Sequence, residues 1–428
     1  MNIEIVTIGD ELLLGFTVDT NAAHIARTLA DAGVAVVRRA TVGDDEAAIT
    51  ATVREALERT GAVITTGGLG PTSDDRSKPA VGAIFGRRMV LHEPTLAAIR
   101  ERWRTRGLGD LPATNVNQAM VPEGATLLDN NYGSAPGIWL ENERGQWVAM
   151  LPGVPREMRG MLADQILPRL RAHAGAGDHV VASRTLRTSG WPESRIADAV
   201  APIPLPSGVD LAYLPSWEGV DLRLTVRGLA RAAAAECLAS AAAALRAPIA
   251  DIVYGEDGAD LAAIVLDALR SRRWTIAVGE SCTGGMLGMR LTATPRASDV
   301  VLGGIIAYDN AVKVRHLGVQ QATLASEGAV SDAVAREMAS GARAATGATV
   351  GVGITGIAGP GGATPEKPVG MVSIAVDADG AVEARTANFV GDRDEVRRRA
   401  TQAALLMVRR LAAAAPSPAG RTSARALP

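Results

Sequence analysis

Apolar strand-like segments alternate with helical segments along most of this chain, and that alternation is the feature that most constrains its fold. Near the N-terminus, the apolar segments Ile3–Ile8, Ala35–Ala40 and Ala62–Thr66 are separated by helical patterns over Asn21–Asp31 and Glu46–Arg59. Strands that alternate with helices form a mainly parallel sheet covered by helices. We therefore expect an α/β protein whose ligands bind at the carboxyl ends of the strands.

Two linker-like segments, residues 173–178 and 247–259, divide the 428 residues into three parts. Residues 1–172 and 258–415 are predicted to be α/β domains with mainly parallel sheets. Residues 178–250 show a strand, a short helix, two strands and an Ala-rich helix, which predicts a small α+β module. The Pro-, Ala-, Ser- and Arg-rich tail 416–428 is expected to be disordered.

Composition excludes several classes of protein. A net charge of −2 argues against a dedicated nucleic-acid binder. No apolar run reaches the roughly 18 residues of a membrane span, and the start reads as a strand, so we expect neither a membrane helix nor a secretory signal. The two cysteines, Cys237 and Cys282, exclude a disulfide framework and fit a reducing cytoplasm.

Lysine is rare among the basic residues. Of 44 Lys and Arg side chains, only Lys78, Lys313 and Lys367 are lysine. Because arginine does not lose its proton in proteins, a retained lysine can mark a place where an amine must deprotonate or act as a compact charge. The alternative is that all three lie by chance on solvated surfaces.

A Gly-rich loop follows the strand Ala62–Thr66. Its glycines, Gly67, Gly68 and Gly70, can present main-chain N–H groups to phosphate oxygens. The spacing matches neither a Walker loop nor the dinucleotide fingerprint.

Three acidic turns follow strands of the first domain. They contain Asp10, Asp44, and the pair Asp74 and Asp75. Carboxylates beside a phosphate cradle would repel an anion unless a divalent cation bridges them, so we expect a metal on Asp10, Asp74 and Asp75, with Asp44 nearby. The alternative is that each acidic turn caps the next helix.

A nucleophile position follows the strand Thr275–Val278 in the last domain. Ser281 and Cys282 are rival nucleophiles there, and the following turn of Thr283, Gly284 and Gly285 opens a helix whose free N–H groups can stabilise an oxyanion. No histidine lies in a comparable loop. A partly desolvated Lys313 can act as the base, directly or through Tyr308. The alternative is that Tyr308 packs and Lys313 is a surface charge.

A second Gly-rich loop follows the strand Thr349–Ile354. Its residues Thr355, Gly356 and Gly359 are expected to line the same pocket and to hold a ribose-phosphate, with Arg393 as a further phosphate ligand. Lys367 pairs either with a phosphate or, on the protein surface, with its neighbour Glu366.

Together these motifs resemble the CinA family of competence/damage-inducible proteins, in order and over nearly the whole chain. The segments that carry the resemblance are Gly9–Gly15, Asp19–Asn21, Thr65–Asp75, Leu151–Met158, Glu280–Gly285, Tyr308–Lys313 and Thr355–Gly370.

The resemblance implies a molybdopterin-binding-like first domain that hydrolyses ADP-ribose to AMP and ribose 5-phosphate with Mg²⁺, Mn²⁺ or Co²⁺. It implies a last domain that deamidates nicotinamide mononucleotide without a cofactor, with the family's serine, tyrosine and lysine on Ser281, Tyr308 and Lys313. It also implies a homodimer.

The middle module resembles the family's KH-type domain. Because a KH domain grips nucleic acid through a Gly-x-x-Gly loop, and this segment offers only Pro206-Ser207-Gly208, we expect a spacer or assembly element that does not bind nucleic acid. The competing function class is a non-catalytic partner protein in DNA uptake or repair, with a degenerate nucleotide-binding first domain.

Overall fold

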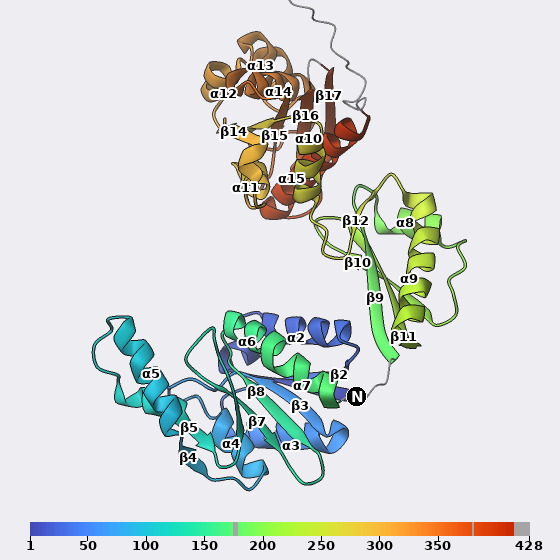
Figure 1. Ribbon diagram of the computed structural model, residues 1–428. Helices are drawn as coiled ribbons and strands as arrows, with labels where there is room; N and C mark the ends of the chain where they lie inside the picture. Colours follow the sequence, from blue (N-terminus) through green and yellow to red (C-terminus); the bar gives the residue numbers. More distant parts are fainter. Residues whose placement is uncertain (174–178, 379–380, 415–428) are drawn as a thin grey trace, which may run out of the picture. The chain divides into compact units, whose positions relative to one another are not determined.

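The computed structural model describes residues 1–173, 179–378 and 381–414 (Figure 1). The expected linker at 173–178 and the expected tail at 416–428 therefore lie almost wholly outside the described residues. The chain divides into two compact units, Met1–Ser183 with Thr225–Leu238, and Arg184–Leu224 with Ala239–Pro428.

The first domain is built on a six-stranded sheet of order β2-β1-β3-β8-β7-β6. Strands β1, β2, β3 and β8 are parallel, and β7 is antiparallel to both of its neighbours. The prediction of a mainly parallel α/β domain is confirmed. The strands are β1 (Asn2–Ile8), β2 (Ala35–Val42), β3 (Ala62–Thr66), β6 (Thr126–Leu128), β7 (Gly137–Glu141) and β8 (Trp147–Leu151).

Helices cover both faces of this sheet because side chains of the strands alternate between two cores. In β1, Ile3 and Ile5 belong to one core, and Val6 and Ile8 belong to the other. In Figure 1, α2 and α6 lie on one side of the sheet, and α3 and α4 lie on the other. The helices are α1 (Asp10–Leu13), α2 (Thr20–Asp31), α3 (Glu46–Thr60), α4 (Ser77–Ile84), α5 (Glu93–Thr105), α6 (Pro155–Met161) and α7 (Leu167–His173).

Two details of the first domain differ from a simple alternation of strands and helices. A small separate sheet pairs β4 (Met89–Leu91) with β5 (Met120–Pro122), which follows the 3-10 helix Ala113–Ala119. The last helical segment of the domain contains a π-helical stretch, Leu162–Ile166, between α6 and α7.

The middle module has a four-stranded sheet of order β10-β11-β9-β12. Its elements are β9 (His179–Thr188), α8 (Glu193–Val200), β10 (Val209–Pro215), β11 (Val220–Ala230), α9 (Arg231–Arg246) and β12 (Val253–Glu256). The α+β prediction is confirmed. The prediction of a second linker over 247–259 is wrong, because β12 lies within it and pairs antiparallel with β9.

Within the described residues, one helical stretch, Arg231–Ile249, has the length and apolar composition that a membrane crossing requires. The core helix of a soluble protein meets the same test. The buried residues Ala234, Leu238, Ala242 and Leu245 recur at three- or four-residue spacing, as they do on a helix with one covered face.

The last domain has a five-stranded sheet of order β14-β13-β15-β16-β17. Strands β14, β13 and β15 are parallel, and β16 and β17 are antiparallel additions. The strands are β13 (Ile276–Glu280), β14 (Val301–Ile306), β15 (Val350–Gly356), β16 (Met371–Ala378) and β17 (Ala381–Asn388). The helices are α10 (Leu261–Ser271), α11 (Met286–Thr292), α12 (Asn310–Leu317), α13 (Gln321–Glu327), α14 (Asp332–Thr346) and α15 (Arg393–Ala414).

Candidate functional site

A cavity of about 240 Å³ opens at the carboxyl ends of the parallel strands in the last domain. It brings together residues that are far apart in the sequence but lie on loops after β13, β14 and β15, and on α15. Its polar and glycine lining includes Ser281, Tyr308, Asn310, Lys313, Thr355, Gly356, Gly359, Gly361, Gly362 and Arg393.

The three parallel strands end side by side because main-chain hydrogen bonds continue just past their last residues. The N–H of Ser281 donates to the carbonyl oxygen of Ile354 at 2.9 Å, and the N–H of Ala307 donates to that of Glu280 at 2.7 Å. Ser281, the segment before α12 and Thr355 therefore meet at one edge of the sheet.

Lys313 lies in the interior beside this cavity, with only 2% of its surface exposed. Its Nζ donates to the main-chain oxygen of Tyr308 at 3.0 Å and to Oδ1 of Asn310 at 3.2 Å. Burial lowers the pKa of Lys313 below its ordinary value, and the nearby carboxylate of Asp309 partly opposes that shift. A neutral amine has two N–H hydrogens and one lone pair, so these two acceptors can be satisfied while the lone pair remains available.

Of the two rival nucleophiles, the structure favours the hydroxyl. Burial raises the pKa of Cys282 to about 12, so its thiol stays protonated at neutral pH and is a poor nucleophile. The hydroxyl of Ser281 makes no hydrogen bond to any side chain or main-chain atom in the described ranges, and Ser281 lines the cavity.

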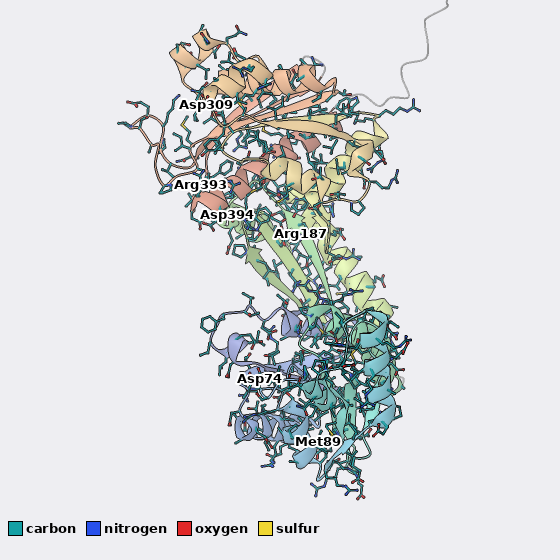
Figure 2. The ribbon with its side chains drawn as sticks, turned by 90° about the vertical axis from the view of Figure 1, so that its left-hand side faces the viewer. Asp74, Met89, Arg187, Asp309, Arg393 and Asp394 are labelled. Carbon is teal, nitrogen blue, oxygen red and sulfur yellow. The ribbon has the colours of Figure 1, made fainter. Side chains whose placement is uncertain are left out.

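Tyr308 is positioned differently from the predicted relay. Strand β14 ends at Ile306, so Tyr308 lies beyond it with 61% of its surface exposed. Its hydroxyl accepts a hydrogen bond from Arg393 at 2.9 Å, whereas Lys313 contacts only its main-chain oxygen. Arg393 also donates to the carbonyl oxygen of Gly359 at 2.6 Å, and so links the start of α15 to the second Gly-rich loop. Figure 2 labels Arg393 in the last domain.

The N–H groups expected to face a ligand at the start of α11 are largely occupied by a buried carboxylate. Glu280 accepts hydrogen bonds from the N–H groups of Gly285 at 3.1 Å, Leu287 at 3.1 Å and Gly288 at 2.8 Å. Thr283, Gly284 and Gly285 do not line the cavity. The N–H groups of Gly284 and Gly285 already donate to Ser281 and Glu280, so their predicted role as ligand donors is wrong, whereas that of Thr283 stays a prediction. Glu280 serves as the anion that a helix N-terminus favours.

We expect Glu280→Gln to weaken the last domain without altering the residues that line the cavity. The amide offers one acceptor oxygen in place of two and carries N–H hydrogens that face other donors. Loss of charge-assisted, buried hydrogen bonds of this kind costs on the order of 2 kcal/mol. Urea unfolding of the wild type and the variant measures the effect, with Glu366→Gln on the exposed surface as the control. Equal stability of all three proteins would contradict the capping role.

The second Gly-rich loop and the segment next to it are held by hydrogen bonds to the main-chain oxygens of residues 327–330. The hydroxyl of Thr355 donates to the carbonyl oxygen of Ala329 at 2.7 Å. Lys367 donates to the carbonyl oxygens of Glu327 at 2.5 Å and Val330 at 2.7 Å, which makes it a support for the cavity wall and not a phosphate ligand. Gly359 has a φ of 81°, a left-handed conformation that favours glycine.

The first domain has a larger cavity of about 540 Å³ at the corresponding edge of its own sheet. Its lining includes Glu11, Asn21, Asp44, Gly67, Gly68, Gly70, Asp74 and Asp75, but not Asp10. A Cβ atom on Gly67 would come within 2.1 Å of the carbonyl oxygen of Ile8, so the loop needs glycine to pass this close to β1.

The acidic residues of this cavity have distinct roles. Asp75 accepts hydrogen bonds from the N–H groups of Gly70 at 2.7 Å and Thr72 at 2.8 Å, and from the Thr72 hydroxyl at 2.6 Å. The structure therefore makes Asp75 the anchor of the Gly-rich loop and not a free metal ligand. Asp10 and Asp44 each accept a hydrogen bond from the other's main-chain N–H, at 3.2 and 3.0 Å.

Burial, together with the neighbouring carboxylates of Asp10, Glu11 and Asp74, raises the pKa of Asp44. In the part of the chain that the structure describes, no three His, Cys, Asp or Glu side chains are arranged to hold a metal by themselves. A repulsive carboxylate cluster beside a phosphate-sized cradle fits a cation held jointly with a phosphate ligand, as Mg²⁺ commonly is.

Three residues that sequence reasoning did not assign are prominent in these sites. Asn310 holds the amine of Lys313, and Glu280 caps α11. Asn21 donates to the Thr66 hydroxyl at 3.2 Å and to the carbonyl oxygen of Gly153 at 2.7 Å, and so joins α2 to the ends of two strands. The sequence did contain a signal for Asn21. It is a polar residue at a position where the helical spacing of Ile25 and Leu29 predicts an apolar one.

Comparison with known proteins matches all three parts of the chain. Residues 258–412 match the model described as "CinA C-terminal domain", residues 4–172 match "Probable molybdopterin binding domain", and residues 183–255 match "Damage-inducible protein CinA KH domain".

Curated relatives match over nearly the full length. A CinA-like protein of Gemmatimonas aurantiaca is 58% identical over 411 residues, which are 96% of each chain. A CinA-like protein of an Anaeromyxobacter species is 43% identical over 412 residues, 96% of this chain and 98% of its own. Among solved structures, CinA of Thermoplasma acidophilum is 34% identical, with a TM-score of 0.36, covering 40% of this chain and 96% of its own.

Proposed function

The chain belongs to the CinA family, and we propose that it is a bifunctional hydrolase of pyridine nucleotides. Its last domain deamidates nicotinamide mononucleotide to nicotinate mononucleotide and ammonia. Its first domain hydrolyses ADP-ribose to AMP and ribose 5-phosphate with a divalent metal. The observation that carries the first of these proposals is the buried amine of Lys313, which lines the same cavity as the hydroxyl of Ser281.

In the proposed reaction, the lone pair of Lys313 removes the proton of the Ser281 hydroxyl as its oxygen attacks the carboxamide carbon. The C–N bond then breaks, and the protonated Lys313 returns that proton to the departing nitrogen, which leaves as ammonia. Water, deprotonated by the same amine, hydrolyses the ester and restores Ser281. Each step uses a base whose pKa is lowered toward neutrality, as general-base catalysis requires.

The developing oxyanion needs a hydrogen-bond donor, and the N–H groups at the start of α11 that bind Glu280 cannot serve. Cys282 follows the nucleophile directly and is one of the lining residues, so we assign this role to its main-chain N–H, the donor that strand-to-helix nucleophile turns use. Arg393 and the Gly-rich loop 355–362 supply the positive charge and close main-chain approach that a nucleotide phosphate favours. Tyr308, held by Arg393, serves as the exposed rim of this subsite and not as a proton relay.

For the first domain, Asp44 and Asp74, which line the cavity, would hold the cation together with the diphosphate, and Asp75 would hold the loop that meets the phosphates. The lining does not include Asp10, whose carboxylate accepts a hydrogen bond from the N–H of Asp44. The cation would neutralise diphosphate charge and polarise the reacting phosphorus. The protein's own contribution is to present the carboxylates and the main-chain N–H groups of the Gly-rich loop other than those of Gly67 and Gly70, which donate to Leu151 and Asp75.

Product analysis after separate incubation with the two nucleotides tests both proposals. Release of ammonia and nicotinate mononucleotide from the first, and of AMP and ribose 5-phosphate from the second, would support the two activities. A chain that converts neither nucleotide, with any of Mg²⁺, Mn²⁺ or Co²⁺ present, would instead be a non-catalytic partner protein.

We expect Asp74→Asn to lower metal-dependent ADP-ribose hydrolysis about a hundredfold or more, because the neutral amide weakens the cation's hold on the diphosphate. Deamidation of nicotinamide mononucleotide should be unchanged. Asp110→Asn, which removes an exposed carboxylate outside the cavity, is the matched control. Release of AMP from ADP-ribose at several metal concentrations measures the effect, and equal hydrolysis by both variants would remove Asp74 from the site.

A further inference from the structure

A second cavity in the unit that contains the last domain is not used by the proposed reaction. It encloses about 320 Å³ between the loops 189–192 and 217–219 and one face of α15. It shares no lining residue with the cavity around Ser281. Its apolar walls are formed chiefly by Trp191, Trp217, Phe389, Leu406 and Met407.

One buried donor in this lining has no acceptor. Gln402 is only 2% exposed, and its Oε1 accepts a hydrogen bond from Arg290 at 2.9 Å. That bond fixes the orientation of the amide, so Nε2 is the atom left over. Nε2 has no hydrogen-bond partner among the described residues, although a buried amide nitrogen without an acceptor is costly.

A second orphan donor lies one turn earlier on the same helix. The Nε of Arg399 is buried and has no partner in the described part of the chain. Because residues three apart on a helix are neighbours, Arg399 and Gln402, which both line the cavity, place two unpartnered donors in the same wall. Two adjacent N–H donors match the two oxygens of a carboxylate.

The charge of the lining also favours an anion. Arg385, Arg399 and Arg410 line the cavity, and Glu218 is the single acidic residue among the described lining residues. Glu218 is already paired with Arg187, and its other oxygen lies 3.9 Å from Arg290. The described lining residues therefore carry more positive than negative charge.

We propose that this cavity is a second ligand site, which binds a small aromatic carboxylate. The carboxylate would accept hydrogen bonds from Nε2 of Gln402 and Nε of Arg399, and the ring would pack against Trp191, Phe389 and Leu406. Aromatic side chains with a few convergent donors are the usual composition of a small-molecule site. This site does not depend on the proposed amidase activity.

Calorimetric titration of the full chain with 1-naphthoate tests the proposal, with uncharged 1-naphthamide as the matched ligand. We expect one naphthoate per chain and an affinity about tenfold or more above that of the amide, because the amide loses a charge-assisted hydrogen bond.

Two variants test whether the ligand binds in this cavity. Arg399→Met keeps the aliphatic stem but removes the donor, and Gln402→Glu keeps the acceptor for Arg290 but replaces the orphan donor with an oxygen. Each should weaken naphthoate binding about tenfold or more. Arg315→Met removes a charge from an exposed position of the same domain and should leave binding unchanged. Thermal unfolding verifies that each variant is folded. Absent binding, equal binding of the two ligands, or undiminished binding by a folded Arg399→Met chain would overturn the proposal.

Discussion

Ser281→Ala is expected to abolish release of ammonia from nicotinamide mononucleotide, with a loss of about a thousandfold or more in kcat. The hydroxyl is the only atom of Ser281 that the proposed reaction uses, and its removal leaves no group to form the ester. Because the change deletes one oxygen from a side chain without hydrogen-bond partners in the described ranges, the fold should be retained. Ammonia release under saturating substrate is the measurement.

Cys282→Ala is the matched control, since it removes the rival nucleophile from the adjacent position. Its thiol is held protonated by burial, which raises its pKa to about 12, so kcat should change little. Hydrolysis of ADP-ribose by both variants reports that the chain is otherwise intact. If the serine variant remained active and the cysteine variant did not, Cys282 would be the nucleophile and the assignment would be reversed.

Lys313→Met is expected to lower kcat by about a hundredfold to ten-thousandfold, the range that a positioned general base contributes. Lys313→Arg should fail to a similar degree, because a guanidinium does not lose its proton in a protein. In the wild type, kcat/KM should rise with pH as the amine becomes neutral and should level off above its lowered pKa. A stopped assay for ammonia over a range of pH values measures the profile.

The pH dependence of the free energy of unfolding is an independent test of the pKa of Lys313. Burial places the pKa of Lys313 in the folded chain below the ordinary value of 10.5. The unfolded chain then binds a proton that the folded chain lacks, so the free energy of unfolding should rise with pH between the lowered pKa and 10.5. Lys313→Met should lack that part of the rise. An active Lys313→Met chain would contradict the proposed base, whatever its stability.

The edge of the sheet where the candidate site lies could be predicted from sequence. Parallel strands end at one edge of a sheet, so the alternation of strands and helices places Ser281 after β13 and Thr355 at the end of β15 on the same edge, and the pairing of β13 with β15 brings them close. The rarity of lysine pointed to Lys313, and the structure buries that residue beside the same cavity.

The partners of individual side chains could not be predicted in this way. Glu280 reads as one more acidic residue near a turn, yet its carboxylate fills the helix N-terminus that the glycines seemed to leave open. The sequence offers Tyr308 as a proton relay for Lys313, but this residue lies beyond the end of β14 at Ile306, and its hydroxyl accepts a hydrogen bond from Arg393. Such details depend on where a strand ends to within one residue, which hydrophobic patterning does not resolve.

The charge state of Lys313 is the claim on which the amidase proposal depends, and NMR titration of lysine labelled with ¹³C at Cε measures it directly. With three lysines in the chain, such a sample gives at most three signals, and the one missing from Lys313→Met belongs to Lys313. We predict that this signal titrates below 10.5, because burial lowers the pKa of the Lys313 amine. A midpoint at or above 10.5 would show that the amine is a permanent cation and would contradict its role as the base.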